Sequence, residues 1–359
     1  MRNMFRGFRP TRRGLLAGAG AGIVGLSVLP RGALAEEEKK LNFYNWDTYI
    51  GETTLQDFNE ETGIEVKMDL YADNDELFAK LKEGNPGYDL IIPTNDYVER
   101  MITADMLLPL DHGKIPNMSN IAPGFQEASF DPGRKHSMPY MWGTIGIGYR
   151  ISKVEGTPDS WKWVYDSDKY SGRMSLLGDG NAVIGMALKY LGFSLNSKDP
   201  AEIKQAEELL IAQKKHIKVF APDNGQDLLA SGEVDLAQEW NGDVLQVITE
   251  DDDIGYALPK EGGLLWQDCL CIPKGGAHPD NAHALINYIL AAEPGAAIAD
   301  YIQYATANEA ARKLLPDEYN KNPAIFPSED AVAKGEAQLY LGEERNRMID
   351  EAWTRIKAA

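Results

Sequence analysis

Short apolar runs typical of β-strands alternate with amphipathic stretches of helical period from residue 41 onward. The first predicted strands are 41–46, 64–70 and 89–92, and the helices between and after them are 53–62, 75–82 and 97–101. Strands that alternate with helices form a parallel sheet, so this part is predicted to be a βαβαβ half of an α/β protein.

A second alternation follows a stretch rich in Pro and Gly, residues 132–139. Its predicted strands are 144–149, 174–177, 217–220 and 234–238, and its helices are 182–191, 203–213 and 226–230. A further strand at 268–272 precedes predicted helices at 283–290, 296–302, 310–315, 329–337 and 345–356. We therefore expect two α/β lobes, joined by chain crossovers, with a cleft between them.

Residues 1–35 have the features of an export signal. They contain a paired-arginine segment (11–16), a Gly/Ala-rich apolar stretch (15–29) and the small-residue sequence Ala33-Leu34-Ala35. The apolar stretch is shorter than the roughly 20 residues of a membrane-spanning helix. We expect cleavage after Ala35 and a periplasmic location, and the paired arginines favour a route that exports folded protein.

The net charge restricts the class of partner. Removing residues 1–35 takes away six arginines and no acidic residue, so the formal charge goes from −19 to −25. Nucleic acid and anionic membranes are poor partners for such a surface, whereas a small cation is favoured. The 324 residues that remain exceed what one hydrophobic core usually holds, in agreement with two lobes.

The sequence carries no recognised enzyme or cofactor signature. There is no GxGxxG after the first strand, no P-loop, no GxSxG and no HExxH, and the five histidines are dispersed. Cys269 and Cys271 lie two apart on a predicted strand, a spacing poorly suited to a disulfide or a metal site, so buried thiols are expected. We expect no enzyme activity, cofactor or metal.

Three Trp-Asp pairs lie at the downstream ends of apolar runs: Trp46 with Asp47, Trp240 with Asp243, and Trp266 with Asp268. An aromatic face beside a carboxylate suits an organic cation, because both attract positive charge. All three pairs are predicted to lie just past strand ends, where α/β sheets bind ligands. Each Trp taken alone is more often a core residue.

Further polar and aromatic candidates follow the predicted strands, namely Tyr49, Thr94, Asp96 and Asp179. Thr94 could instead cap the next helix, and Asp179 lies in a turn-forming context. Their joint occurrence after successive strands favours a binding protein over an enzyme.

Several sequence blocks, in order, resemble the periplasmic spermidine/putrescine binding proteins of ABC importers. The blocks are Phe43–Tyr49, Tyr88–Pro93, Met138–Gly143, Trp240–Gly242 and Lys260–Asp268. The resemblance covers the chain from about Leu41 to the final helix. It implies a two-lobe type II periplasmic binding protein fold that closes on one polyamine, binds an ABC transporter permease and acts as a monomer. The expected lobes are 36–144 with 268–313, and 145–267 with 314–359.

The resemblance also implies roles for individual residues. Trp46 and Tyr49 would line the ligand channel beside Asp47, and Thr94 would take a place usually held by serine. Asp268 matches a central ammonium ligand. The other implied contacts are a carboxylate at Asp179, aromatic walls at Trp240 and Trp266, a putrescine-type carboxylate at Asp243, and polar contacts at Tyr304 and Gln338.

Two departures from the family pattern leave the length of the ligand open. Ala182 replaces a carboxylate of the spermidine-type members, and Asp96 replaces a tyrosine. Asp243 favours a diamine such as putrescine. The alternatives are another organic cation, ferric ion bound by Tyr49, Tyr97 and carboxylates, and an exported amine-processing enzyme.

Overall fold

A computed structural model describes residues 37–359, and the predicted export signal lies outside the described residues. The first part of the sheet is parallel: β1 (Lys40–Asn45) pairs with both β2 (Glu65–Leu70) and β3 (Leu90–Ile91). Three helices follow these strands in turn, α1 (Thr54–Thr62), α2 (Asn74–Lys82) and α3 (Asn95–Thr103). The predicted βαβαβ half is confirmed.

A second parallel group forms the opposite end of the sheet. Its central strand, β5 (Met174–Leu177), pairs in parallel with β6 (Ile217–Ala221) and with β7 (Leu236–Trp240). The helices that connect and follow these strands are α5 (Gly180–Tyr190), α6 (Pro200–Lys214), α7 (Gly225–Ala230) and α8 (Asn241–Ile248).

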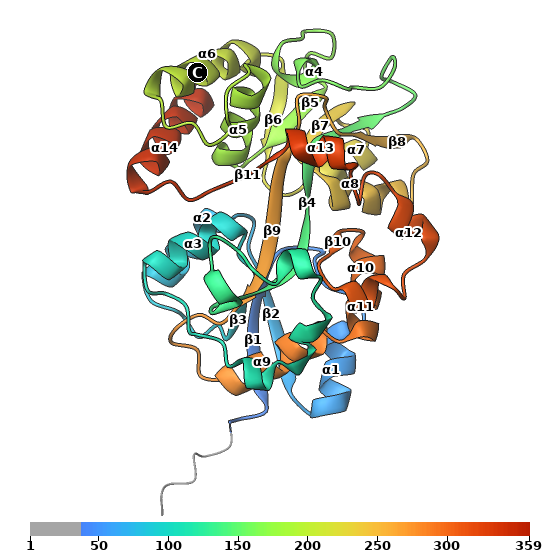
Figure 1. Ribbon diagram of the computed structural model, residues 1–359. Coiled ribbons are helices and arrows are strands. Elements are labelled where there is room, and N and C mark those ends of the chain that lie inside the picture. The colour runs from blue at the N-terminus through green and yellow to red at the C-terminus, as the bar shows by residue number, and fades with distance from the viewer. Residues whose placement is uncertain (1–36) are drawn as a thin grey trace, which may run out of the picture. The chain divides into compact units, whose positions relative to one another are not determined.

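Two long antiparallel strands join the two groups, β4 (Ser137–Arg150) and β9 (Leu264–Cys271). β9 pairs with β3 on one side and β4 on the other, and β4 pairs in turn with β7. The resulting strand order is β2-β1-β3-β9-β4-β7-β5-β6. Figure 1 shows β4 and β9 running from the β1–β3 group to the β5–β7 group.

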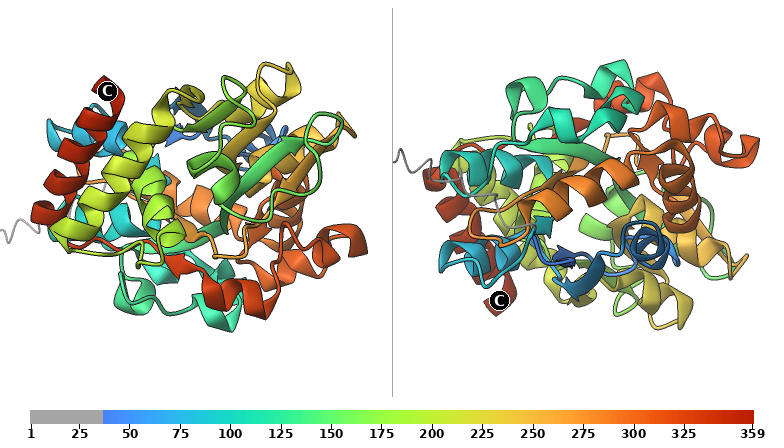
Figure 2. Two further views of the ribbon diagram at one scale, coloured as in Figure 1. Left: turned by 90° about the horizontal axis from the view of Figure 1, so that it is seen from above. Right: turned by 90° about the horizontal axis from the view of Figure 1, so that it is seen from below.

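The C-terminal part of the chain contributes elements to both groups. Its helices are α9 (Pro279–Ile289), α10 (Ala292–Ile302), α11 (Glu309–Arg312), α12 (Asp317–Lys321), α13 (Glu329–Lys334) and α14 (Glu343–Ala358). The last of these, α14, lies beside α6 and α5 (Figure 2), and Arg355 donates to Glu207 of α6 at 2.8 Å. Within residues 37–359, no helix has the length and apolarity needed to cross a membrane.

The remaining elements are short. They are α4 (Lys162–Tyr165), β8 (Ile254–Ala257), β10 (Ala305–Thr306), β11 (Glu336–Ala337) and the 3₁₀ helices His112–Lys114, Pro116–Asn120, Pro123–Phe125 and Pro132–Arg134. β8 and β10 pair with β4, and β11 pairs with β9. The two long strands that join the groups therefore also anchor these short strands.

The sequence prediction was wrong about one Trp-Asp pair. Trp266 and Asp268 lie inside β9 and not past a strand end, because the strand starts at Leu264 and is longer than the predicted 268–272. Residues two apart on a strand project from the same face, so Trp266 and Asp268 still lie together. Both cysteines, Cys269 and Cys271, are buried thiols as predicted.

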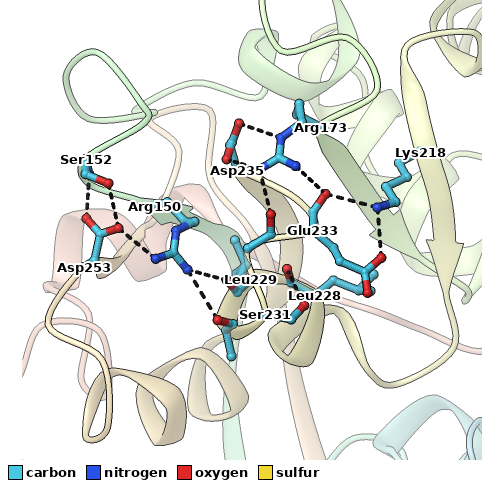
Figure 3. Close-up of polar contacts among 12 residues, drawn as sticks. Arg150, Ser152, Arg173, Lys218, Leu228, Leu229, Ser231, Glu233, Asp235 and Asp253 are labelled. Carbon is cyan, nitrogen blue, oxygen red and sulfur yellow. Dashed lines mark hydrogen bonds and ion pairs between the residues drawn. The ribbon is translucent and has the colours of Figure 1, made fainter.

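Basic residues at the outer end of the second group are paired with acids (Figure 3). Arg150, the last residue of β4, lies 3.0 Å from Asp253, and Arg173 lies 2.6 Å from Asp235. None of these residues lines the cavities described below. The basic side chains of this region therefore pair with acids that lie outside the cavities.

Candidate functional site

A cavity lies where the carboxyl ends of both parallel strand groups meet the crossing strand β9. Its empty volume is about 370 Å³, and we call it the first chamber. The residues that line it are Trp46, Asp47, Tyr49, Thr94, Asp223, Trp240, Asp243, Trp266, Asp268 and Tyr304. Nine of these ten were predicted from the sequence, and Asp223 was not. Ligands of α/β sheets bind beyond the carboxyl ends of the strands, and this chamber has that position.

Aromatic rings form the walls of the first chamber. Trp266 packs edge-on against Trp240, with ring centroids 5.9 Å apart, and against Tyr304 at 5.1 Å. Tyr49 packs edge-on against Tyr304 at 5.2 Å. Trp46 is fixed by a hydrogen bond of 2.9 Å from its indole nitrogen to the carbonyl of Ile92. The walls are therefore apolar, and contacts between the rings and with the backbone hold them in place.

A turn after β1 brings two predicted site residues, Asp47 and Tyr49, to the chamber. Thr48 has a φ of 47°, a left-handed conformation that is unfavourable for a β-branched residue. Asp47 and Tyr49 lie on either side of it, and both line the chamber. Tyr49 is buried, whereas Asp47 stays exposed at the edge. Backbone strain of this kind is often found at functional sites.

Asp268 is the one carboxylate that β9 contributes to the chamber. It is 6% exposed, its backbone forms an isolated bridge with Thr94, and its Oδ1 has no hydrogen-bond partner within residues 37–359. The Tyr49 hydroxyl and the Trp266 indole nitrogen are likewise buried without a partner in that part of the chain. Burial raises the pKa of Asp268 to about 7, although the nearby hydroxyls of Thr94 and Tyr49 lower it.

Asp243 approaches the chamber from the first turn of α8. Burial raises its pKa to about 7, while the Tyr304 hydroxyl acts in the opposite direction. The preceding residue, Gly242, lies so close to Tyr304 that a Cβ atom there would overlap the ring. Glycine at this position allows α8 to bring Asp243 against the aromatic wall.

The acids of the first chamber have no basic partner. Among residues 37–359, no Lys, Arg or His forms an ion pair with Asp47, Asp223, Asp243 or Asp268. Buried carboxylates without partners are costly, so they are normally paired or protonated. The chamber can therefore bind a cation that brings its own positive charge.

A second chamber of about 380 Å³ adjoins the first. It is lined by Trp46, Ala72, Asp73, Leu177, Gly178, Asp179, Pro222, Asp223 and Trp240. Asp73 caps α2 by accepting from the N–H of Glu76, and Asp179 caps α5 by accepting from the N–H of Ala182. Burial raises the pKa of Asp179 to about 7, and nearby carboxylates, including Asp73, add to this shift.

Two predicted contacts lie outside both chambers. Asp96 and Gln338 are buried and hydrogen-bonded to each other at 2.7 Å, and neither lines a chamber. Burial raises the pKa of Asp96, and the hydrogen bond from Gln338 lowers it. Their direct contact with a ligand stays a prediction.

Sequence analysis missed Asp223 and Asp73. Asp223 follows the end of β6 in the sequence Pro222-Asp223-Asn224-Gly225, and Asp73 follows β2. Both positions obey the strand-end rule that identified the other candidates. Neither has an aromatic residue directly beside it in the sequence, and this is the feature that distinguishes Trp46 with Asp47 from an ordinary turn.

The chain is similar to a described family over most of its length. The family model for bacterial extracellular solute-binding proteins matches residues 53–327. The putrescine-binding periplasmic protein SpuD of Pseudomonas aeruginosa is 34% identical over 91% of this chain and 94% of that protein. The spermidine/putrescine-binding periplasmic protein of Escherichia coli is 35% identical over 96% of this chain and 98% of that protein.

Solved structures agree with these sequence matches. The spermidine/putrescine ABC transporter substrate-binding protein PotD of Streptococcus pneumoniae superposes with a TM-score of 0.76 and 32% sequence identity. The match covers 89% of this chain and 99% of that chain. The predicted two-lobe α/β fold is thereby confirmed.

Proposed function

The chain belongs to the bacterial extracellular solute-binding proteins, and from this premise we propose that it captures a polyamine and delivers it to an ABC importer. The ligand is putrescine, spermidine or a related linear amine. Relatives whose names specify putrescine or spermidine are about one-third identical over nearly the whole chain, which supports this ligand class. Their periplasmic location supports an extracytoplasmic location for this protein.

One observation carries the proposal: four carboxylates without basic partners line a chamber with aromatic walls. Ammonium groups would pair with the acids, which are Asp47, Asp223, Asp243 and Asp268. The methylenes between the ammonium groups would pack on the faces of the Trp and Tyr rings. A neutral ligand would leave the carboxylates unpaired, and an anion would be repelled by them.

Asp268 would be the central ligand. Its unpartnered Oδ1 and the unpartnered hydroxyl of Tyr49 are both buried and belong to the lining of the first chamber. An ammonium group donates up to three hydrogen bonds, so it could bind acceptors from more than one of these residues. Trp46, Trp240 and Trp266 would then enclose the alkyl chain.

Closure of the lobes would transmit ligand binding to the permease. The strands β4 and β9 join the two groups and pair through Gly143 with Trp266 and Thr144 with Leu265, so we place the hinge there. We keep the first two predicted crossovers, near residues 144 and 268. The last crossover is better placed after α12, because Tyr319 of that helix donates to the carbonyl of Tyr304.

Export completes the proposed role. The paired-arginine segment, the apolar stretch and Ala33-Leu34-Ala35 support cleavage after Ala35 and delivery of a folded monomer to the periplasm. Size-exclusion chromatography with light scattering would test the monomer, and mass spectrometry of the exported protein would test the cleavage site.

Ferric ion and enzyme turnover are weaker alternatives. Within residues 37–359 there is no group of three His, Cys, Asp or Glu side chains arranged to hold a metal ion. Tyr49 and Tyr97 do not form a shared ligand set, because Tyr97 hydrogen-bonds Asp75 at 2.5 Å and does not line either chamber. A ferric titration that produced a charge-transfer band would favour iron over an amine.

A thermal-shift panel tests the proposed function. Putrescine, cadaverine, spermidine, spermine and a quaternary amine are added separately to the exported protein, with glutamate as an anionic control. A ligand that binds only the native state raises the melting temperature, so we expect linear amines to do so and glutamate to have no effect. The absence of a response to every amine would refute the proposal.

A further inference from the structure

The two chambers share three lining residues, Trp46, Asp223 and Trp240, and therefore adjoin at these residues. We propose that together they form one slot for a linear amine with three ammonium groups, and that Asp223 is the ammonium-binding residue at their junction. This inference depends on the proposed function, because it concerns the amine that occupies the same site. It assigns a ligand contact to a residue that the sequence resemblance did not identify.

The backbone holds Asp223 in an unusual conformation at the junction. Its φ of 48° lies in the left-handed region, which non-glycine residues seldom adopt, although Asp tolerates it better than most. Such conformations persist where the surrounding structure enforces them, and they cluster at functional sites. The side chain is thereby directed by the turn after β6 to a position that borders both chambers.

The turn after β6, which carries Asp223, packs against a buried carboxyl group. Glu239 of β7 is fully buried and lies so close to Gly225 that a Cβ atom there would overlap its Oε2. A side chain at this position, which is two residues after Asp223, would have to displace the buried carboxyl group of Glu239. The turn is therefore fixed by packing against β7.

Asp223 lies among other carboxylates without a balancing positive charge. Desolvation and the charges of Asp243, Asp47, Asp268 and Asp73 raise its pKa well above the usual range. In the part of the chain that the structure describes, no basic side chain pairs with it. A ligand cation at the junction would relieve repulsion from both chambers at once.

Carboxylates at three successive places along the slot match a triamine. Asp243 and Asp268 lie in the first chamber, Asp73 and Asp179 in the second, and Asp223 between them. Trp46 and Trp240 border both chambers, so they offer apolar surface to the alkyl segments on either side of an inner ammonium group. A diamine has only two ammonium groups and would leave one of these three places without a cation.

Two hydrogen-bond acceptors show that the first chamber is built to receive such a ligand. Asp268 Oδ1 and the Tyr49 hydroxyl are buried, belong to lining residues and have no partner within residues 37–359. The two residues are 6% and 4% exposed, respectively. The unmet hydrogen bond of the neutral Tyr49 hydroxyl is an observation independent of the acidic cluster.

Calorimetry with a diamine and a triamine tests the inference. Putrescine and spermidine are titrated into the wild-type protein and into Asp223→Asn and Asp179→Asn. We expect spermidine to bind the wild type at least about tenfold more tightly than putrescine. Asp223→Asn should reduce that ratio at least about tenfold, since it removes the charge while Asn tolerates the same backbone conformation.

Asp179→Asn distinguishes ligand binding in the second chamber from ligand binding in the first. It should weaken the binding of spermidine at least about tenfold but change the affinity for putrescine by no more than about twofold, because Asp179 lines only the second chamber. The matched control is Asp252→Asn, an exposed acid that lines neither chamber and should leave both affinities unchanged.

The outcomes distinguish the inference from the proposed function. Binding of neither amine by the wild type would refute the proposed function itself. Binding of both amines with an unchanged ratio in Asp223→Asn would overturn the role of Asp223 and leave polyamine capture intact. Should Asp223→Asn fail to fold, an unchanged spermidine affinity in Asp179→Asn would still overturn the two-chamber triamine site.

Discussion

The hydroxyl of Tyr304 accepts a hydrogen bond from the backbone N–H of Asp243 at 3.2 Å. The same tyrosine packs on Trp266 and Tyr49, so one side chain joins the aromatic wall to the first turn of α8. Its hydroxyl also lowers the pKa of Asp243, which burial raises to about 7. Tyr304 thus both positions a carboxylate and keeps part of it charged at neutral pH.

Tyr304→Phe should weaken amine binding without removing the aromatic wall. The ring stays, but the lost hydroxyl leaves the Asp243 N–H without its acceptor and allows the pKa of Asp243 to rise. We expect affinity at pH 7 to fall by about two- to tenfold in calorimetry. The exposed Tyr301→Phe is the matched control.

Raising the pH tests the electrostatic part of this effect. At pH 8.5 Asp243 should be ionised in both proteins, so the difference in affinity should shrink. An unchanged affinity of Tyr304→Phe at pH 7 would show that the hydroxyl has no role in binding.

Asp268→Asn should abolish most amine binding while stabilising the unliganded protein. Loss of a buried charge partner costs about 2 to 5 kcal/mol of binding free energy, so affinity should fall by more than about tenfold. The pKa of about 7 means that folding opposes the ionised form, so the neutral amide should raise the melting temperature at pH 8.

These opposite effects exclude simple unfolding as the cause of lost binding. Calorimetry gives the affinity, and a thermal melt without ligand gives the stability of the same sample. An Asp268→Asn protein with wild-type affinity would remove Asp268 from the site.

Trp240→Leu should weaken amine binding less than Asp268→Asn does. A cation–π contact contributes about 0.5 to 2 kcal/mol, and leucine keeps part of the apolar surface. Trp163→Leu is a matched control, because Trp163 also precedes an aspartate but stacks on Tyr170 and lines neither chamber. Equal losses of affinity in both variants would contradict a specific role for Trp240.

The strand-end rule predicted much of the site because it describes a local relation between a strand and the loop that follows. Trp46 and Asp47 follow β1, and Trp240 and Asp243 flank the end of β7, as the apolar runs indicated. α8 itself was not predicted, although its first turn carries Asp243. A short helix directly after a strand offers too few turns for a clear periodic pattern.

Local sequence patterns do not show which loops face each other in the folded protein. Asp223 sits in a Pro-Asp-Asn-Gly sequence that resembles an ordinary turn. Its position beside Trp46 and Trp240 arises only after β4 and β9 bring the two strand groups together. The same crossing explains why Trp266 and Asp268, inside β9, reach the chamber without a strand end.

The stability of the free protein and its affinity for an amine should change with pH in opposite directions. Asp179, Asp243 and Asp268 each have a pKa of about 7 in the folded protein, against 3.8 for an ordinary aspartate side chain. The native state therefore binds more protons than the unfolded state between about pH 4 and pH 7. The stability contributed by these groups is present at low pH and is lost as the pH rises through 7. A bound polyamine favours the ionised carboxylates, so its affinity should instead increase from pH 5 to pH 8.

Thermal melts at pH 5, 6, 7 and 8, with and without spermidine, measure both trends. We expect the increase in melting temperature caused by the amine to be small at pH 5 and largest at pH 8, because protonated acids cannot pair with ammonium groups. Asp268→Asn should flatten the pH dependence of the unliganded protein, and exposed Asp252→Asn should not. Calorimetry at pH 7 in buffers of different ionisation enthalpy should detect proton release on binding. An amine-induced shift of equal size at pH 5 and pH 8 would mean that the acids of the slot do not hold the ligand.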